Sequence, residues 1–260
     1  LFAQAKNTKN KFVNLPFINI NDFDYPLPDA RIAQYPLDKR SASKLLVYKH
    51  GRIEHRNFSE LTNLLPDNAH LIFNNTKVIQ ARLHFRKETG AEVEVFLLNP
   101  VNAENAGEVL TRKETSAWHC MVGNKKRFKD DDVLQKDDLS ALWLDRENDV
   151  IQFNYGDKCF ADVIQEIGNL PIPPYLNRET ESIDHTRYQT TFAINSGSVA
   201  APTAALHFDD EINHQLKEKG MQSSFLTLHV GAGTFKPVGT ENAMDHVMHE
   251  EYIIFSKELI

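Results

Sequence analysis

NSGSVAAPTAALHF (residues 195–208) and SFLTLHVGAGTF (residues 224–235) each carry a run of small residues next to a histidine. Small residues let the backbone approach a ligand closely, because no bulky side chain stands in the way. His207 closes the first run, and His229 precedes the second. A packed core alone does not require this combination twice. We therefore take the two loops as the working centre of the molecule.

The composition is that of an ordinary globular protein, with 41% hydrophobic and 25% charged residues in a chain of 260. No apolar run approaches the roughly 20 residues that a membrane-spanning helix needs. Cys120 and Cys159 show neither the spacing of metal ligands nor a disulfide framework. We therefore expect a cytoplasmic protein that is long enough for two domains.

The chain is acidic, with a formal net charge of −7. This argues mildly against a nucleic-acid partner, because phosphate contacts usually come from a basic surface. Two local basic clusters, at residues 82–87 and 125–129, weaken that argument. The ordinary explanation of such clusters is a solvated face.

Residues 81–156 predict an inserted all-β, barrel-like domain. Short β-like runs follow one another at 81–85, 91–98, 116–122, 140–144 and 150–155. Alternation is clear at Trp118, Cys120 and Val122, which would share one face of a strand. Turn and charge clusters separate the runs, and no long helix interrupts them. Closely spaced strands of this kind indicate a small barrel or sandwich.

The flanking residues, 1–80 and 157–260, predict a discontinuous α/β main domain that is incomplete at its C-terminal end, with a polar arm over residues 1–20. The order of strand, loop, helix, strand and loop is typical of this class. The expected strands lie at 71–73 (buried), 187–194, 224–230 and 251–255, with a hairpin turning at His50 and Gly51. The expected helices lie at 59–65, 160–167 and 209–219, and Gly220 follows the last of them.

The second loop follows a strand, which is a ligand-loop position in α/β sheets. It lacks the third glycine of GxGxxG and the Lys-Ser/Thr ending of a P-loop. Ser198 does not lie in a G-x-S-x-G motif, so a nucleophile elbow is unsupported. These exclusions leave a loop for a ligand with ring and ribose surfaces but no phosphate. A tight structural turn is the alternative.

The sequence HVMHEE holds His246, His249, Glu250 and Glu251 in six residues. The i, i+3 spacing would place both histidine rings on one helical face beside a carboxylate. A metal site would need a third ligand such as His229, but the segment matches no zinc-protease motif. General acid–base work is therefore favoured, and surface histidines without a role are the ordinary alternative.

Arg82, Lys87 and Glu88 are expected where the main domain meets the β insertion. Domain junctions favour binding sites, although exposed ion pairs explain such residues equally well.

Five segments together resemble the S-adenosylmethionine:tRNA ribosyltransferase-isomerases of queuosine biosynthesis. They are DFDYPLPDARIAQYPLDKR (22–40), FNNTKVIQARLHFRKETGAEVEVFLL (73–98), RYQTTFAINSGSVAAPTAALHF (187–208), TLHVGAGTFKPV (227–238) and HVMHEEY (246–252). They follow the order of the family, and such agreement is highly specific. Three departures are Ser41-Ala42-Ser43-Lys44 for the usual Asp-x-Ser-Arg, Asn75 for an aspartate, and Ala205 for a glycine.

The resemblance implies a reaction. The ribosyl part of S-adenosylmethionine is transferred to 7-aminomethyl-7-deazaguanine at the tRNA wobble position and isomerised there. Epoxyqueuosine forms, and methionine and adenine are released. The sulfonium acidifies the adjacent C5′–H, so a base must remove that proton. The substrate amine is the nucleophile, so no enzyme nucleophile, metal or permanently bound cofactor is implied.

The resemblance also suggests roles for three groups of residues. Proton transfer is expected from His249 or Glu250, with His229 and His246 nearby. The expected S-adenosylmethionine-binding residues are Ser198, Pro202, Thr203, His207, Gly231, Gly233 and Thr234. Residues expected to contact the modified base or the anticodon phosphates are Lys77, Arg82, Lys87 and Glu88.

Two other kinds of protein remain as alternatives. The first is a metal-dependent hydrolase built on His229, His246 and His249, which stoichiometric zinc in the purified protein would favour. The second is a non-catalytic tRNA-binding relative, suggested by the departures and the expected loss of C-terminal sequence. It would bind tRNA without releasing methionine.

Overall fold

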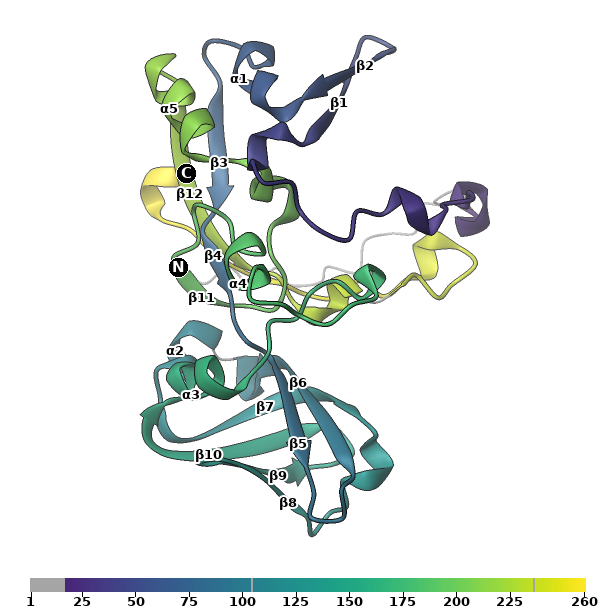
Figure 1. Ribbon diagram of the computed structural model, residues 1–260, viewed down its shortest axis with the longest axis vertical. Helices are drawn as coiled ribbons and strands as arrows, with labels where there is room; N and C mark the ends of the chain where they lie inside the picture. Colours follow the sequence, from purple (N-terminus) through teal and green to yellow (C-terminus); the bar gives the residue numbers. More distant parts are fainter. Residues whose placement is uncertain (1–16, 104, 236) are drawn as a thin grey trace, which may run out of the picture.

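The computed structural model describes residues 17–103, 105–235 and 237–260, so most of the arm expected at residues 1–20 lies outside the described residues. Figure 1 shows a barrel-like sheet at one end of the long axis and the other sheets at the opposite end. Among the described helices, none is long and apolar enough to cross a membrane.

The barrel-like part is one antiparallel sheet of six strands in the order β5-β6-β7-β10-β9-β8. The strands are β5 (Arg82–Arg86), β6 (Glu92–Pro100), β7 (Lys113–Gly123), β8 (Val133–Lys136), β9 (Leu139–Asp145) and β10 (Val150–Cys159). The two outer strands, β5 and β8, approach each other, so the sheet is nearly closed. The predicted barrel-like architecture is confirmed. The sequence analysis missed β8, in which only Leu134 is buried and alternation is weak.

Alternate side chains of the sheet fill its interior, including Trp118 and Cys120 on β7. The helix α2 (Ala106–Leu110) adds two further buried residues to this core. The helix α3 (Phe160–Ile167) closes one end, and the Phe160 ring lies 5.7 Å from that of Trp118 and 4.8 Å from that of Tyr155. Because α3 packs on the barrel core, the domain boundaries at 81 and 156 stay a prediction.

The other part contains parallel strand pairs. β3 (His70–Asn74) is parallel to β12 (Gln222–His229), and β4 (Thr76–Val78) is parallel to β11 (Asn195–Ser198). β13 (Tyr252–Ile254) adds to β12 in the antiparallel sense. Only Phe73 of the strand expected at 71–73 is buried, and Ile72 is 56% exposed.

The helix α5 (Asp210–Glu218) lies against these strands and confirms the helix expected there. The side chain of Asp209 caps its start by accepting from the Ile212 amide at 3.1 Å. Gly220 follows its end with φ of +69°, a conformation that favours glycine. Ile212 and Leu216 are buried in a cluster with Phe73, which fixes the helix on β3.

A hairpin of β1 (Lys44–Lys49) and β2 (Arg52–Asn57) turns at His50 and Gly51, as predicted. Both turn residues have positive φ, as the common two-residue hairpin turn requires. The helices α1 (Leu61–Leu64) and α4 (Asp184–Arg187) are one turn long. Short 3-10 turns lie at Ile20–Phe23, Asp29–Arg31, Arg40–Ala42, Phe58–Glu60, Val101–Ala103, Lys125–Arg127, Pro174–Leu176, Thr203–His207, Ala232–Phe235, Ala243–Asp245 and Lys257–Leu259.

The strand expected over 187–194 is wrong. α4 ends at Arg187, and the next strand, β11, begins only at Asn195, inside the expected loop. The side chain of Gln189 explains the difference, because its amide accepts from Val78 N at 3.0 Å and donates to Val78 O at 2.8 Å. One side chain thus makes the hydrogen bonds that a neighbouring strand would offer β4.

Candidate active site

The two small-residue loops lie side by side. The hydroxyl of Ser198 accepts from Val230 N at 2.9 Å and donates to Ala200 O at 2.7 Å. Val199 N also donates to Val230 O at 3.0 Å. The first loop is therefore tied to the carboxyl end of β12, directly before Gly231. Since Ser198 is fully buried and its hydroxyl is used internally, its direct contribution is to hold the loops together.

Both loops also contact the barrel-like part. Val199 and Ala232 are buried in the same apolar cluster as the barrel core. The ring of Phe235, at the end of the second loop, lies 6.5 Å from that of Phe96 on β6. Small residues in these loops thus permit close packing at the junction of the two parts of the molecule.

His229 lies against the backbone of the first loop. A Cβ atom on Gly197 would lie only 2.7–2.9 Å from three atoms of the imidazole, and the φ of Gly197 is +150°. On its other side, His229 Nδ1 lies 2.8 Å from the hydroxyl of Thr76, a fully buried residue. Burial lowers the pKa of His229 below its ordinary value. The ring is therefore neutral at pH 7.

The hydrogen bond from Thr76 indicates which tautomer of His229 is present. The other acceptor near this hydroxyl, Asn195 O, is 3.5 Å away, which is long for an O–H···O bond. The hydroxyl is thus better placed to donate to Nδ1 at 2.8 Å. From this geometry we infer that Nε2 carries the proton of the neutral ring. His229 then offers an N–H donor.

His249 lies against the second loop and has a carboxylate partner. Its Nε2 is 3.2 Å from Glu251 Oε1, and the same oxygen accepts from the Gly231 amide at 3.2 Å. A Cβ on Gly233 would collide with the His249 ring, lying 2.6 Å from its Cδ2. The His249 side chain is 33% exposed, so a ligand can reach it.

Both histidines gather at the carboxyl end of β12. In the β12–β13 ladder His229 is directly opposite Tyr252, and Glu251 immediately precedes that residue. Opposite residues in an antiparallel pair have Cα atoms about 4.5–5.5 Å apart. The site therefore combines a neutral N–H donor, a histidine–carboxylate pair and two glycines against which the histidine rings pack.

The helix expected to carry His246 and His249 is absent. The 3-10 turn Ala243–Asp245 ends at His246, whose backbone is extended, and no helix is assigned to residues 246–251. Within the described residues, His246 forms no side-chain hydrogen bond or ion pair. Glu250 is exposed, and Glu251 is the carboxylate that meets His249. The strand predicted at 251–255 was the available sequence signal for Glu251, because the first residues of this strand lie beside the second loop.

Metal ligation has no support in the described part of the chain. No three His, Cys, Asp or Glu side chains there gather as a metal site requires. The hydrolase alternative built on His229, His246 and His249 therefore lacks a structural basis.

The remaining residues expected to bind S-adenosylmethionine are more scattered. Thr203 and Thr234 are exposed, and Pro202 directly precedes the turn that carries Thr203. His207 contacts Ser43, whose hydroxyl lies 3.0 Å from Nδ1, and Phe58, whose ring centre lies 5.3 Å from that of the imidazole. Burial and the nearby Arg40 lower the pKa of His207. The assignment of these residues to the ligand stays a prediction.

The residues expected to contact tRNA lie in two separate regions, one near the junction of the two parts and one beyond the end of β5. Arg82 lies at the junction, where its backbone pairs with Asn169 and its Nε lies 3.6 Å from a Glu94 oxygen. Lys77 is exposed on β4. The expected junction position is wrong for Lys87 and Glu88, because β5 runs away from the junction and ends before them (Figure 1). Lys87 is held there in an ion pair with Asp132.

The sequence analysis missed a polar network that supports the site. Asn75 Oδ1 accepts from Thr227 Oγ1 at 2.6 Å and from Asn195 Nδ2 at 3.1 Å. The amide of Asn74 bonds to the backbone N and O of Leu228 at 3.0 and 2.8 Å. With Thr76, these residues join β3, β4, β11 and β12 beneath His229. The available signal was the polar run NNT directly after a predicted strand.

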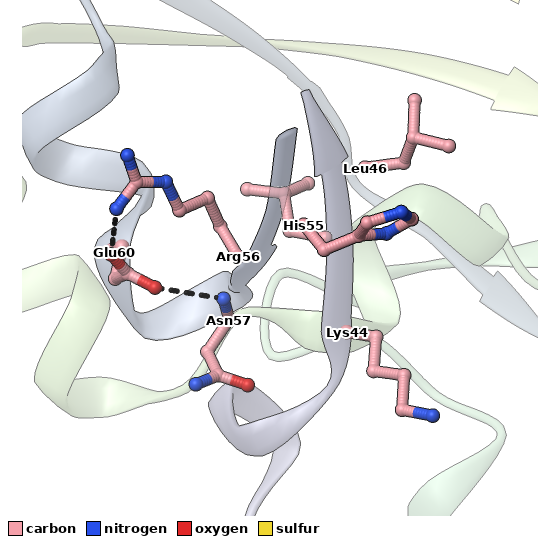
Figure 2. Close-up of a pocket in the computed structure, with 7 residues that line it drawn as sticks. Lys44, Leu46, His55, Arg56, Asn57 and Glu60 are labelled. Carbon is pink, nitrogen blue, oxygen red and sulfur yellow. Dashed lines mark hydrogen bonds and ion pairs between the residues drawn. The ribbon is translucent and has the colours of Figure 1, made fainter. Parts of the chain in front are cut away.

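Two pockets lie away from this cluster. One, of about 480 Å³, includes Phe73, Phe192 and Phe225 among its lining residues and is lined by no histidine or carboxylate. The other, of about 410 Å³, lies at the β1–β2 hairpin (Figure 2). We place the candidate active site at the two histidines, because proton-transfer groups lie there beside Gly231, where a Cβ would meet no atom within 4 Å.

Comparison with known proteins decides the family. The model of the queuosine biosynthesis protein family matches residues 20–260. The chain belongs to this family. The resemblance inferred from the five sequence segments is therefore confirmed.

Curated relatives of this queuosine-family chain carry one name, S-adenosylmethionine:tRNA ribosyltransferase-isomerase. That of Sulfurihydrogenibium sp. is 40% identical over 247 residues, covering 94% of this chain and 70% of the relative. That of Psychrobacter arcticus is 38% identical over 260 residues, covering 92% and 64%. A crystal structure of the S-adenosylmethionine tRNA ribosyltransferase of Thermotoga maritima is 29% identical and covers 80% of this chain and 58% of that one, with a TM-score of 0.30.

Proposed function

We propose that this protein transfers the ribosyl part of S-adenosylmethionine to 7-aminomethyl-7-deazaguanine in tRNA and isomerises it to epoxyqueuosine, releasing methionine and adenine. Family membership over residues 20–260 and the activity named for the relatives support the reaction. The observation that carries it is the pair of histidine–glycine contacts at the end of β12. We further propose that the described residues on either side of the barrel-like part form one α/β domain into which that part is inserted, with α3, which packs on the barrel core, at the junction.

His249 serves as the base in this proposal. Its Nε2 lies 3.2 Å from Glu251 Oε1, so the carboxylate would stabilise the imidazolium formed when His249 accepts the acidic C5′ proton of the sulfonium substrate. The Gly231 amide, which donates to the same oxygen, keeps Glu251 in place. The amine of the modified base attacks, so no residue of this chain forms a covalent bond.

His229 serves as a donor in the same proposal. A neutral ring with its proton on Nε2 can donate to a nitrogen of the departing adenine, which lowers the barrier to its release. Gly197, against which the His229 ring lies, leaves the backbone free of a side chain on that side. The arrangement suits a ring-and-ribose ligand that carries no phosphate.

A substitution at Gly233 tests the placement of the site. Gly233→Val would displace the His249 ring, and we expect affinity for S-adenosylmethionine to fall at least about tenfold in a calorimetric titration, because about 1.4 kcal/mol suffices for that change. Gly239→Val is the matched control, since a Cβ there meets no atom within 4 Å. Equal affinities of the two variants would count against this placement.

A non-catalytic tRNA-binding relative is the second candidate. The observation that favours it is Asn75, one of the departures from the family pattern, whose side chain is bound within the polar network below His229. This candidate predicts tRNA binding without release of adenine or methionine.

A further inference from the structure

The hairpin β1–β2 presents a fully exposed face. Its register pairs Leu46 with His55 and Tyr48 with Ile53 across the two strands, so these four side chains share one side of the ribbon. Leu46, Tyr48 and Ile53 are 61%, 69% and 61% exposed. The opposite side holds Leu45, which packs on the cluster around Phe58 and anchors the hairpin to the molecule.

The hairpin is basic in an acidic protein. Residues 44–57 contain four lysines or arginines and one acidic residue, whereas the whole chain has a net charge of −7. Arg56 is paired with Glu54 at 2.7 Å and Glu60 at 3.4 Å. In the described part of the molecule, Lys44, Lys49 and Arg52 form no ion pair, so three cations stay free. Lys44 shares the side of the ribbon that holds Leu46 and Tyr48, whereas Lys49 and Arg52 form a cross-strand pair next to the turn on the other side.

The two basic clusters of the barrel-like part, at residues 82–87 and 125–129, are partly offset by nearby carboxylates. Lys125 is paired with Asp149, and Arg146 with Asp130 at 2.8 Å. Lys87 is likewise paired with Asp132. The hairpin differs in that its one acidic residue, Glu54, pairs with Arg56, so no carboxylate within residues 44–57 offsets its other three cations. An anionic polymer would therefore meet less repulsion there than on the barrel-like part, where exposed Arg86 and Lys126 stand among several acidic residues.

A pocket of about 410 Å³ adjoins the hairpin and includes Lys44, Leu46 and His55 in its lining. Figure 2 shows Lys44 and Leu46 on one side of the ribbon and Arg56 reaching Glu60 on the other. The volume of this pocket lies within the range of small-ligand sites, about 300–1,000 Å³. Cations beside an exposed aromatic ring are the usual means of binding single-stranded nucleic acid, since phosphates meet the charges and bases stack on the ring.

We propose that the β1–β2 hairpin is a tRNA-binding surface, in which Lys44, Lys49 and Arg52 contact backbone phosphates and Tyr48 stacks on an unpaired base. This inference rests on the proposed function, which makes tRNA the substrate. It adds a surface separate from Lys77 and Arg82. The three free cations of the hairpin make a second copy of this chain a poorer occupant, because like charges would meet across the interface.

The salt dependence of tRNA binding tests the charges. Lys49→Ala/Arg52→Ala is expected to weaken binding of precursor-bearing tRNA roughly tenfold at low salt and to reduce the slope of log K against log salt by about 1 to 2. Arg86→Ala/Lys126→Ala removes the same charge from exposed, unpaired positions of the barrel-like part and is the matched control. It is expected to change the slope far less.

Substitution of the ring tests stacking. Tyr48→Ala is expected to weaken tRNA binding about tenfold at unchanged salt slope, whereas Tyr48→Phe retains most of the affinity. Wild-type affinity and slope in both hairpin variants would overturn the proposal, as would equal losses in the hairpin and control pairs. A wild-type dimer that Tyr48→Ala converts to a monomer, without loss of tRNA affinity, would assign the face to self-association instead.

Failure of this surface and failure of the proposed function can be told apart. If wild-type protein binds precursor-bearing tRNA and releases adenine while the hairpin variants do so equally well, only the hairpin assignment fails. If the wild-type protein neither binds this tRNA nor releases adenine, the proposed function fails first.

Discussion

Two glycines determine where the candidate catalytic histidines lie. Gly197 and Gly233 are each in contact with an imidazole ring, so that any side chain would displace the ring. Contact with the imidazole rings explains why small residues are needed in both loops, which a tight turn alone would not explain. A ligand that approaches these loops meets backbone and a histidine together.

The His249–Glu251 pair leads to a prediction about proton transfer. His249→Ala is expected to lower adenine release by about 10² to 10⁴, the usual contribution of a general base. Glu251→Gln should lower it less, because the amide still holds the ring but stabilises its charged form poorly. Release is measured by chromatography with precursor-bearing tRNA. Unchanged turnover of His249→Ala would remove this residue from the mechanism, and Glu250→Gln is the neighbouring control.

His229 gives the stability of the protein a pH dependence of known sign. Its folded pKa lies below the ordinary 6.5, because burial penalises the charged ring. Above pH 6.5 folded and unfolded chains both carry the neutral form. As the pH falls below that value, the unfolded chain takes up a proton that the folded protein resists, so the free energy of unfolding falls.

Urea unfolding at pH 7.5 and 5.5 measures this effect. We expect the loss of stability on acidification to be smaller in His229→Gln than in the wild type, because the glutamine cannot titrate. His214→Gln, at an exposed site on α5, is the control and should keep the wild-type pH dependence. If His229→Gln loses as much free energy of unfolding between pH 7.5 and 5.5 as the wild type, burial of the His229 ring is not the cause of the pH dependence.

The sequence singled out His229 and His249 as candidates through the small residues and carboxylates beside them, and their catalytic roles stay a prediction. The roles of Glu251 and Thr76 were missed, because they depend on the β12–β13 and β4–β11 pairings, which connect residues far apart in the chain.

Among the elements, α4 and the connection before it are held by a buried ion pair. Arg178 donates to both oxygens of Asp184 at 2.7 and 2.8 Å, and the two side chains are only 12% and 5% exposed. The Arg178 guanidinium beside Asp184 holds the pKa of that carboxyl below its usual value. The Glu181 amide also donates to Asp184 at 2.8 Å, so the carboxylate organises the whole turn.

Removal of this carboxylate is expected to destabilise the protein strongly. Asp184→Ala leaves the arginine buried without its partner, which typically costs about 3–5 kcal/mol. The matched control is Glu166→Ala, which breaks the exposed Lys158–Glu166 pair at 2.7 Å and should cost less than about 1 kcal/mol. Both are measured by urea unfolding at pH 7.5. Equal small losses would mean that the buried pair does not stabilise α4.

Elements with strong local signals were predicted well. The helix over residues 209–219 has an aspartate cap, an apolar stripe and a following glycine, and the hairpin has a His-Gly turn. Residues 187–194 were misjudged because the β4 edge is satisfied by the single side chain of Gln189, which no local pattern reveals. The short strand β8 was missed because it has little alternation to detect.

Across the whole molecule, the two loops connect the sheet that carries the histidines to the barrel-like part. Val199 and Ala232 are buried with the barrel core, while Gly197 and Gly233, two residues before and one after them, lie against the histidines. The barrel-like sheet thus supports the loops from behind. The sequence indicated both architectures through their different periodicities, but this junction became visible only in three dimensions.

Adenine release measures directly whether this protein transfers the ribosyl part of S-adenosylmethionine to tRNA. Purified protein is incubated with S-adenosylmethionine and either precursor-bearing tRNA or the same tRNA without the aminomethyl precursor, and free adenine and methionine are measured. We expect equal amounts of adenine and methionine, formed only with the precursor-bearing tRNA. If the protein binds this tRNA but S-adenosylmethionine stays intact, the proposed reaction is wrong and a non-catalytic tRNA-binding relative is favoured.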